Sequence, residues 1–184
     1  MTARTRLGDV DYLNDEDSPL NEVDLDTVAG LASAITDNPI LGDTTWGATV
    51  NWIGGFRSEA LIRDFEAIPS DEPAGLGGSD RAPNPVEQLI AALGNCLAVG
   101  YAVNASAAGI ELKDLTIELE GDLNLSTFLG LGAGNAGYSG IRAKVRLDSD
   151  ADPDALAVLH EKVTSTSPVG HTLSRSVPVT IELA

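Results

Sequence analysis

The chain of 184 residues carries 28 acidic against 11 basic side chains, which gives it a formal net charge of −17. So negative a surface repels phosphate backbones and anionic lipid, which argues against nucleic acid and membranes as partners. The hydrophobic fraction of 43% is enough for one well-filled core, but no run approaches the roughly 20 apolar residues of a membrane span.

Residues 1–42 are predicted to be an acidic N-terminal extension with one amphipathic helix. Acidic side chains crowd residues 9–26 with no basic residue between them, which is typical of a solvated, flexible tail. Adaptation to a salty cytoplasm would also fit, since only three of the basic residues are lysine. Apolar residues then recur at spacings of three and four, which predicts a helix that ends at Asn38-Pro39. They are Leu25, Val28, Ala32 and Ile35.

Residues 43–184 predict a single α+β domain that starts with a β-hairpin. Apolar residues alternate with small or polar ones from Trp46 to Ile53, which indicates a strand. Gly54-Gly55 then supplies a two-residue turn into a returning strand, Phe56 to Phe65. Residues 69–84 are rich in Pro, Gly, Ser and Asp, and therefore predict a loop.

A long helix is predicted over residues 85–107. Asn84 is a preferred N-cap, Pro85 fits the first helical position, and Glu87 stands where a capping-box carboxylate belongs. Nearly every residue from Leu89 to Val103 is apolar or small, so the helix should be buried on most sides. It is interrupted too often for a membrane span, by Gly94, Asn95 and Gly100.

The remaining sequence predicts three more strands and a second helix. Alternation over residues 115–119 and over 141–147 indicates two strands joined by a glycine-rich connection, 130–140. Asp152-Pro153 opens a helix, and Val177 to Leu183 alternates as a closing strand. The order β-β-α-β-β-α-β favours an α+β fold in which antiparallel strands cover one or two buried helices.

The motifs predict neither a cofactor nor a metal. Gly132 to Gly137 fits the pattern G-x-G-x-x-G, but the next predicted element is a strand, whereas a dinucleotide site needs a helix there. The two histidines, His160 and His171, have no close ligand spacing to each other or to the cysteine. The acidic turn from Asp148 to Asp152 lacks the glycine and the distal glutamate of a calcium loop.

Cys96 is the only cysteine, so it cannot form an internal disulfide, which agrees with a reducing compartment. No apolar stretch follows the first arginines as a secretory signal requires, and we therefore expect the cytoplasm. A free cysteine in an apolar helix is often an inert, small hydrophobic residue. To react near neutral pH it needs a cation or hydrogen-bond donors from another segment. Arg57, Arg63 and Arg81 are the candidates.

Two segments resemble the signatures of the OsmC/Ohr family. Residues 77–97, which run from Gly77-Gly78-Ser79 through Asn84-Pro85 to Cys96-Leu97, are similar to the loop and long central helix that carry the family's first active cysteine. Ser167-Pro168-Val169-Gly170-His171 resembles the second signature, which normally reads Cys-Pro-Val. The closing strand also fits, and the resemblance covers about residues 40–184.

The resemblance implies antiparallel sheets wrapped around two central helices in an intertwined homodimer, with each active site at the dimer interface. It also implies thiol-dependent reduction of organic hydroperoxides. Cys96 matches the cysteine that attacks the peroxide, and Arg57 is the best match for a hairpin arginine that stabilises the thiolate. Ser167 stands in place of the resolving cysteine, so an external thiol or dithiol must reduce the protein. Val86 replaces the glutamate that follows Asn-Pro, with Glu87 one place later.

Three functions fit these observations. The first hypothesis is a one-cysteine reductase of organic hydroperoxides in oxidative stress defence. The second is a non-enzymatic dimer that binds a small apolar ligand and has an inert or scavenging thiol. The third is acyl transfer by Cys96 with His171, which the mid-helix position of Cys96 disfavours, since such nucleophiles usually lie at a helix N-terminus or strand turn. Besides Cys96 and Arg57, the pocket is predicted to contain Phe56, Phe65, Ser167 and His171.

Overall fold

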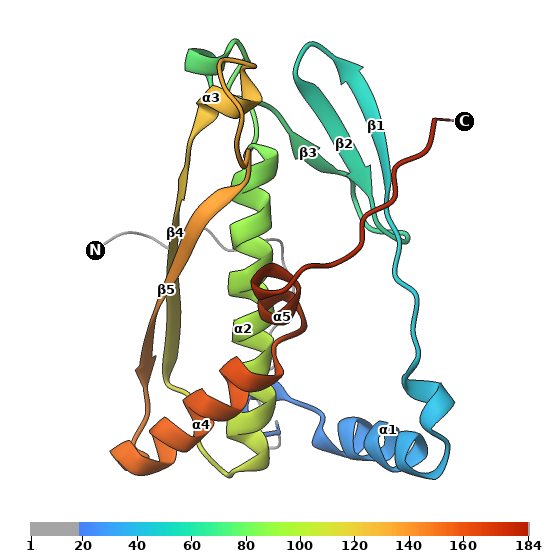
Figure 1. Cartoon of the computed structure of the whole chain (residues 1–184). Helices are drawn as coiled ribbons and strands as arrows, with labels where there is room; N and C mark the ends of the chain where they lie inside the picture. The colour runs from blue at the N-terminus through green and yellow to red at the C-terminus, as the bar shows by residue number, and fades with distance from the viewer. Residues whose placement is uncertain (1–18, 184) are drawn as a thin grey trace.

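The computed structural model describes residues 19–183 and has the α+β architecture expected from the sequence. The long helix α2, Pro85–Ala107, runs through the middle of the molecule, with one antiparallel sheet on either side of it (Figure 1). The three-stranded sheet has the order β1, Thr49–Gly54, β2, Arg57–Leu61, and β3, Ile68–Ser70. The two-stranded sheet pairs β4, Asp114–Leu123, with β5, Tyr138–Asp148.

Helix α2 starts and ends where the sequence predicts, because its N-terminal cap is complete. Asn84 Oδ1 accepts the Glu87 N–H at 2.9 Å, and Glu87 Oε2 accepts the Asn84 N–H at 2.8 Å. This reciprocal pair satisfies N–H groups that the first helical turn leaves without partners. Further along, Leu97, Tyr101 and Ala105 lie four residues apart and form one buried stripe.

The core lies where α2 crosses the second central helix, α4, Pro153–Thr166. Leu159 and Val163 of α4 are buried in the same hydrophobic cluster as the stripe on α2. A Cβ atom at Gly100 would lie 2.9 Å from Val163 Cγ1, which is closer than side-chain carbons approach. This glycine, which interrupts the apolar run in the sequence, therefore lets the two helices pack closely.

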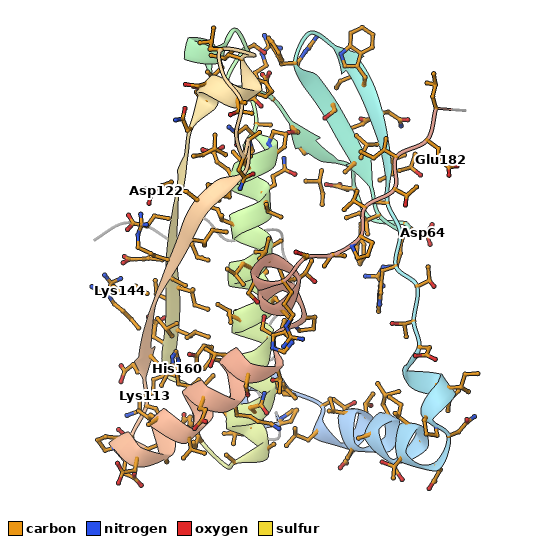
Figure 2. The ribbon with its side chains drawn as sticks, viewed as in Figure 1. Asp64, Lys113, Asp122, Lys144, His160 and Glu182 are labelled. Carbon is orange, nitrogen blue, oxygen red and sulfur yellow. The ribbon has the colours of Figure 1, made fainter. Side chains whose placement is uncertain are left out.

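Strands β4 and β5 present an apolar face to the core and a charged face to solvent, as alternation predicts. Leu115 and Ile117 of β4 are half-buried and pack against the core cluster. On the other face Arg142 Nε and Glu120 Oε1 form an ion pair at 2.9 Å. Lys144 points away from α2 on the same side (Figure 2). One face of this sheet therefore completes the core of the single chain.

The amphipathic helix predicted in the N-terminal region is confirmed as α1, Leu25–Asp37, and a 3-10 turn, η2, Pro39–Gly42, follows it. A preceding 3-10 turn, η1, Leu20–Glu22, is fixed to the end of α2, because the Asn21 side chain donates to Ser106 Oγ at 2.9 Å. Helix α1 itself contains no buried residue. Most of the predicted acidic tail, residues 1–18, lies outside the described residues.

Several predicted strand and loop boundaries are wrong. The returning strand of the hairpin ends at Leu61, and the predicted loop 69–84 contains the end of β3 and a 3-10 turn, η3, Ala74–Leu76. Strand β5 starts inside the glycine-rich connection, after a short helix, α3, Leu125–Phe128. Alternation along one segment does not reveal these limits, since a strand continues only as far as its neighbour offers hydrogen bonds.

The C-terminal end differs most from the prediction. An unpredicted helix, α5, Pro168–Ser174, follows α4, and its N-cap Ser167 accepts the Gly170 N–H at 3.1 Å. The closing strand expected at Val177 to Leu183 is wrong for the single chain, because none of the described strands pairs with this segment. Its apolar side chains are exposed, Val179 by 79% and Ile181 by 91%. The alternating pattern therefore has no strand partner within residues 19–183.

Helix α2 is long and apolar enough to cross a membrane by length and composition, contrary to the expectation from its interruptions. The core helix of a soluble protein meets the same criterion. Here α2 carries the buried stripe and packs against α4, α5 and β4. The prediction that α2 is buried on most sides is nevertheless wrong for the single chain, since only 22% of its most apolar window is buried. One stripe of the helix packs in the core, and side chains on its other faces, such as Val99, are exposed.

Candidate functional site

Cys96 lies on α2 next to the junction between α4 and α5. It is half-buried, and its Sγ is 3.3 Å from Ser167 Oγ, within hydrogen-bond distance for sulfur. Ser167 is 4% exposed and is both the last cap of α4 and the first cap of α5. Close packing of α4 on α2 at Gly100 brings the two residues together across 71 positions of sequence.

The Ser167 hydroxyl has a defined hydrogen-bonding role. Its Oγ accepts the Gly170 N–H, and a Cβ atom at Gly170 would lie only 3.1 Å from that oxygen, so glycine leaves room for this contact. The single hydroxyl proton remains to be donated. Because a thiolate can only accept, Ser167 is the donor whenever Cys96 is ionised.

Cys96 opens into a cavity of about 480 Å³, within the usual size range of small-molecule pockets. The wall is mainly apolar, and of its polar side chains Ser167 contacts the sulfur. The lining residues are Asn95, Cys96, Val99, Gly100, Val103, Asn104, Val163, Thr166, Ser167 and Pro168. Such a cavity suits a small, mainly apolar molecule.

The predicted hairpin residues lie elsewhere in the single chain. Arg57 Nε donates to the Gly54 carbonyl at 3.2 Å, and Arg57, Phe56 and Arg81 line a separate cavity of about 340 Å³. Phe65 stacks under the Arg63 guanidinium, with the ring centroid 4.6 Å from Cζ. Within one chain the structure therefore brings Cys96 together with Ser167, and it does not bring Arg57, Phe56 or Phe65 to the Cys96 cavity.

His171 belongs to α5 and is half-buried. Its backbone N–H donates to the Ser167 carbonyl at 2.9 Å, but the residue is not part of the wall of the Cys96 cavity. A Cys96–His171 nucleophile pair has no direct contact in this arrangement. Among the residues that the structure describes, no group of three or more His, Cys, Asp or Glu could hold a metal ion.

Sequence reasoning missed Asp71, which organises the loop between the hairpin and α2. Its side chain is 1% exposed and accepts four hydrogen bonds, from the Ser79 hydroxyl and from the backbone N–H groups of Glu72, Ser79 and Arg81. The Ser79 hydroxyl above all lowers the pKa of Asp71 from 3.8 to about 2, with the backbone donors helping and desolvation opposing. Nothing in the spacing of the loop singles this aspartate out.

Comparison of the sequence with known proteins finds a matching family and a related protein. A model of the family described as OsmC-like protein matches residues 77–182. The uncharacterised protein YmaD of Bacillus subtilis is 29% identical over 140 residues, which covers 75% of this chain and 85% of the relative.

Two solved structures share the fold at low sequence identity. An OsmC-like protein from Mycoplasma pneumoniae has a TM-score of 0.62 and 18% identity, and covers 72% of this chain and 89% of its own. An organic hydroperoxide resistance protein, OsmC, from Legionella pneumophila has a TM-score of 0.55 and 17% identity. The match covers 71% of this chain and 91% of the Legionella chain.

Proposed function

The chain belongs to the OsmC-like family, and from that premise we propose that it is a one-cysteine, thiol-dependent reductase of organic hydroperoxides. The observation that carries the proposal is the half-buried Cys96 sulfur, which faces an apolar cavity of about 480 Å³ and has the Ser167 hydroxyl 3.3 Å away. The names of relatives such as the Legionella pneumophila hydroperoxide resistance protein support the substrate class.

The reaction proceeds in two stages. The Cys96 thiolate attacks one peroxide oxygen, so an S–O bond forms, the O–O bond breaks, and the alkoxide leaves as an alcohol after taking a proton from solvent. The sulfur is oxidised to a sulfenic acid and the hydroperoxide is reduced. An external thiol then displaces water to give a mixed disulfide, and a second thiol equivalent releases the Cys96 thiol and an external disulfide.

The working form is a homodimer in the cytoplasm. Large apolar side chains of the hairpin region and the C-terminal segment are exposed together in the single chain, which is unusual for a monomer. They are Trp46, Val50, Trp52, Phe56, Phe65, Val177, Val179 and Ile181. A second copy would give Val177–Leu183 a strand to pair with. It would also place Arg57 of the partner subunit beside Cys96, where its guanidinium favours the thiolate.

The absence of a resolving thiol gives this proposal a sharp test. Treatment of the wild-type protein with cumene hydroperoxide should yield a dimedone-reactive sulfenic acid at Cys96, faster than free cysteine is oxidised. In the Ser167→Cys variant the same treatment should yield a disulfide between Cys96 and the introduced cysteine instead. Cys96→Ser is the control for both. Oxidation of Cys96 no faster than that of free cysteine would rule out the reductase.

The apolar wall of the same cavity also supports a second candidate, a non-enzymatic dimer that binds a small hydrophobic ligand. Cys96→Ser distinguishes the two functions, because it removes the nucleophile and leaves the apolar wall in place. Ligand affinity that survives this substitution, together with slow oxidation of the wild-type thiol, would favour the binding protein.

A further inference from the structure

We propose that the thiol which reduces oxidised Cys96 is a small molecule that enters the Cys96 cavity, and not a cysteine residue of another protein. This inference rests on the proposed reductase function and names the class of its second substrate. One equivalent of the small thiol attacks the sulfenic sulfur, so an S–S bond forms and the hydroxyl leaves as water after taking a proton. A second equivalent attacks this mixed disulfide and releases the Cys96 thiol and a small disulfide.

The first argument is that the oxidation cannot move away from Cys96 within the chain. Cys96 is the only cysteine, and the group 3.3 Å from its sulfur is the hydroxyl of Ser167. A hydroxyl forms no disulfide, so no second sulfur of the same chain carries the oxidation to a more accessible place. The reductant must therefore reach the Cys96 sulfur itself.

The second argument is the geometry of a disulfide between two cysteine residues. Such a bond forms only when the two Cα atoms lie about 4.4–6.8 Å apart. Cys96 lies midway along α2, about 16 Å from each end of the helix, and its sulfur contacts Ser167, which is 4% exposed. A cysteine of another protein would therefore have to bring its backbone, and the residues on either side of it, into the space beside α2.

That space is the Cys96 cavity, which α2 lines on one side and Val163, Thr166, Ser167 and Pro168 line on the other. Its volume of about 480 Å³ is typical of pockets that hold small molecules. A small thiol brings no backbone with it, so it needs only this cavity to place its sulfur against that of Cys96. The geometry therefore admits a small thiol and excludes a folded protein.

The proposed dimer strengthens the same conclusion. Val99 belongs to the wall of the cavity and is 69% exposed in the single chain. A second copy that places the partner subunit's Arg57 beside Cys96 reduces the space in front of the sulfur. This excludes a third protein more strongly than it excludes a small molecule, and the guanidinium attracts the thiolate of the incoming reductant.

The test starts from Cys96 sulfenic acid, formed in the full-length protein with one equivalent of cumene hydroperoxide, and follows its reduction at neutral pH. β-Mercaptoethanol should restore the thiol at least about tenfold faster than the same concentration of thioredoxin, which its reductase and NADPH keep reduced. Thioredoxin has the more acidic thiol, with a pKa of about 7, so a preference for the small reagent reports access to the sulfur. The expected intermediate is a mixed disulfide of Cys96 with β-mercaptoethanol, detected by mass spectrometry.

Two threonines of α4 provide a matched pair of variants that tests entry into the cavity. Thr164 and Thr166 are both exposed, and each hydroxyl donates to the backbone carbonyl four residues earlier. Thr166 lines the cavity and Thr164 does not. Thr166→Phe should slow reduction by β-mercaptoethanol at least about fivefold, because the ring narrows the cavity, and Thr164→Phe should change it less than about twofold.

Three outcomes would overturn the proposal. Thioredoxin restores the thiol as fast as β-mercaptoethanol, Thr166→Phe leaves the rate unchanged, or both variants slow it equally. The comparison with thioredoxin uses the wild-type protein, so it stands even if Thr166→Phe fails to fold. Oxidation of Cys96 no faster than free cysteine would refute the reductase function instead, and sulfenic acid formed slowly with hydrogen peroxide would still show which thiol reaches Cys96.

Discussion

Replacing Ser167 tests the contact that defines the thiol site. The Ser167 hydroxyl lies 3.3 Å from the Cys96 sulfur, and a hydrogen bond to a charged group contributes roughly 1.5–3 kcal/mol. Loss of this hydrogen bond to the attacking sulfur should therefore slow sulfenic acid formation at neutral pH by about 10- to 150-fold.

Two variants separate this effect from damage to the fold. Ser167 also caps α5, and loss of such a cap costs roughly 1 kcal/mol for alanine but only a few tenths for glycine. Ser167→Ala and Ser167→Gly should therefore lose the same amount of activity at neutral pH while differing in stability.

The assay is stopped-flow oxidation of Cys96 by cumene hydroperoxide at neutral pH, with urea unfolding in parallel. Both variants should be slower than wild type by the same factor. A wild-type rate in either variant, or rates that follow the loss of stability, would refute the assignment of Ser167 as hydrogen-bond donor to the Cys96 sulfur.

Three further substitutions test the packing, the loop and the assembly. Gly100→Ala should destabilise the fold by about 1–3 kcal/mol in urea unfolding, since the new methyl group would lie 2.9 Å from Val163 Cγ1; an unchanged midpoint would contradict the close helix contact. Asp71 has a folded-state pKa of about 2, below its usual 3.8, so its stabilising effect is present above the usual value and is lost as pH falls toward 2. Asp71→Asn should therefore reduce the loss of stability between pH 5 and about 2. Val179→Asp, at a side chain 79% exposed in the single chain, should shift the protein from dimer to monomer in light scattering, whereas a dimer that persists would place the interface elsewhere.

Local signals in the sequence predicted the parts of the fold that are determined locally. The limits of α2 follow from Asn84, Pro85 and Glu87, whose hydrogen bonds form within one turn. The hairpin follows from its two glycines, which both adopt positive φ. The turn residues are Gly55 and Phe56, however, and not the predicted Gly54-Gly55, because Gly54 still pairs with Arg57 at the end of β1. The apolar repeat of α1 likewise needs no distant partner to be recognised.

What the sequence did not reveal depends on distant contacts. The role of Asp71 rests on a loop that folds back over eight to ten residues, and the contact between Cys96 and Ser167 needs α4 to pack on α2. The closing strand failed for the opposite reason. Its alternation is real, but no strand in the described part of the chain lies beside it.

In the proposed homodimer Arg57 of the partner subunit completes the Cys96 site, and a mixed dimer tests this arrangement most directly. Cys96→Ser and Arg57→Ala chains with different tags are co-expressed, the heterodimer is purified, and its rate of reduction of cumene hydroperoxide with excess dithiothreitol is measured. One intact site per heterodimer should restore about half of the wild-type rate, while each homodimer of variants stays nearly inactive. A heterodimer as inactive as its parents would contradict an active site shared between two chains.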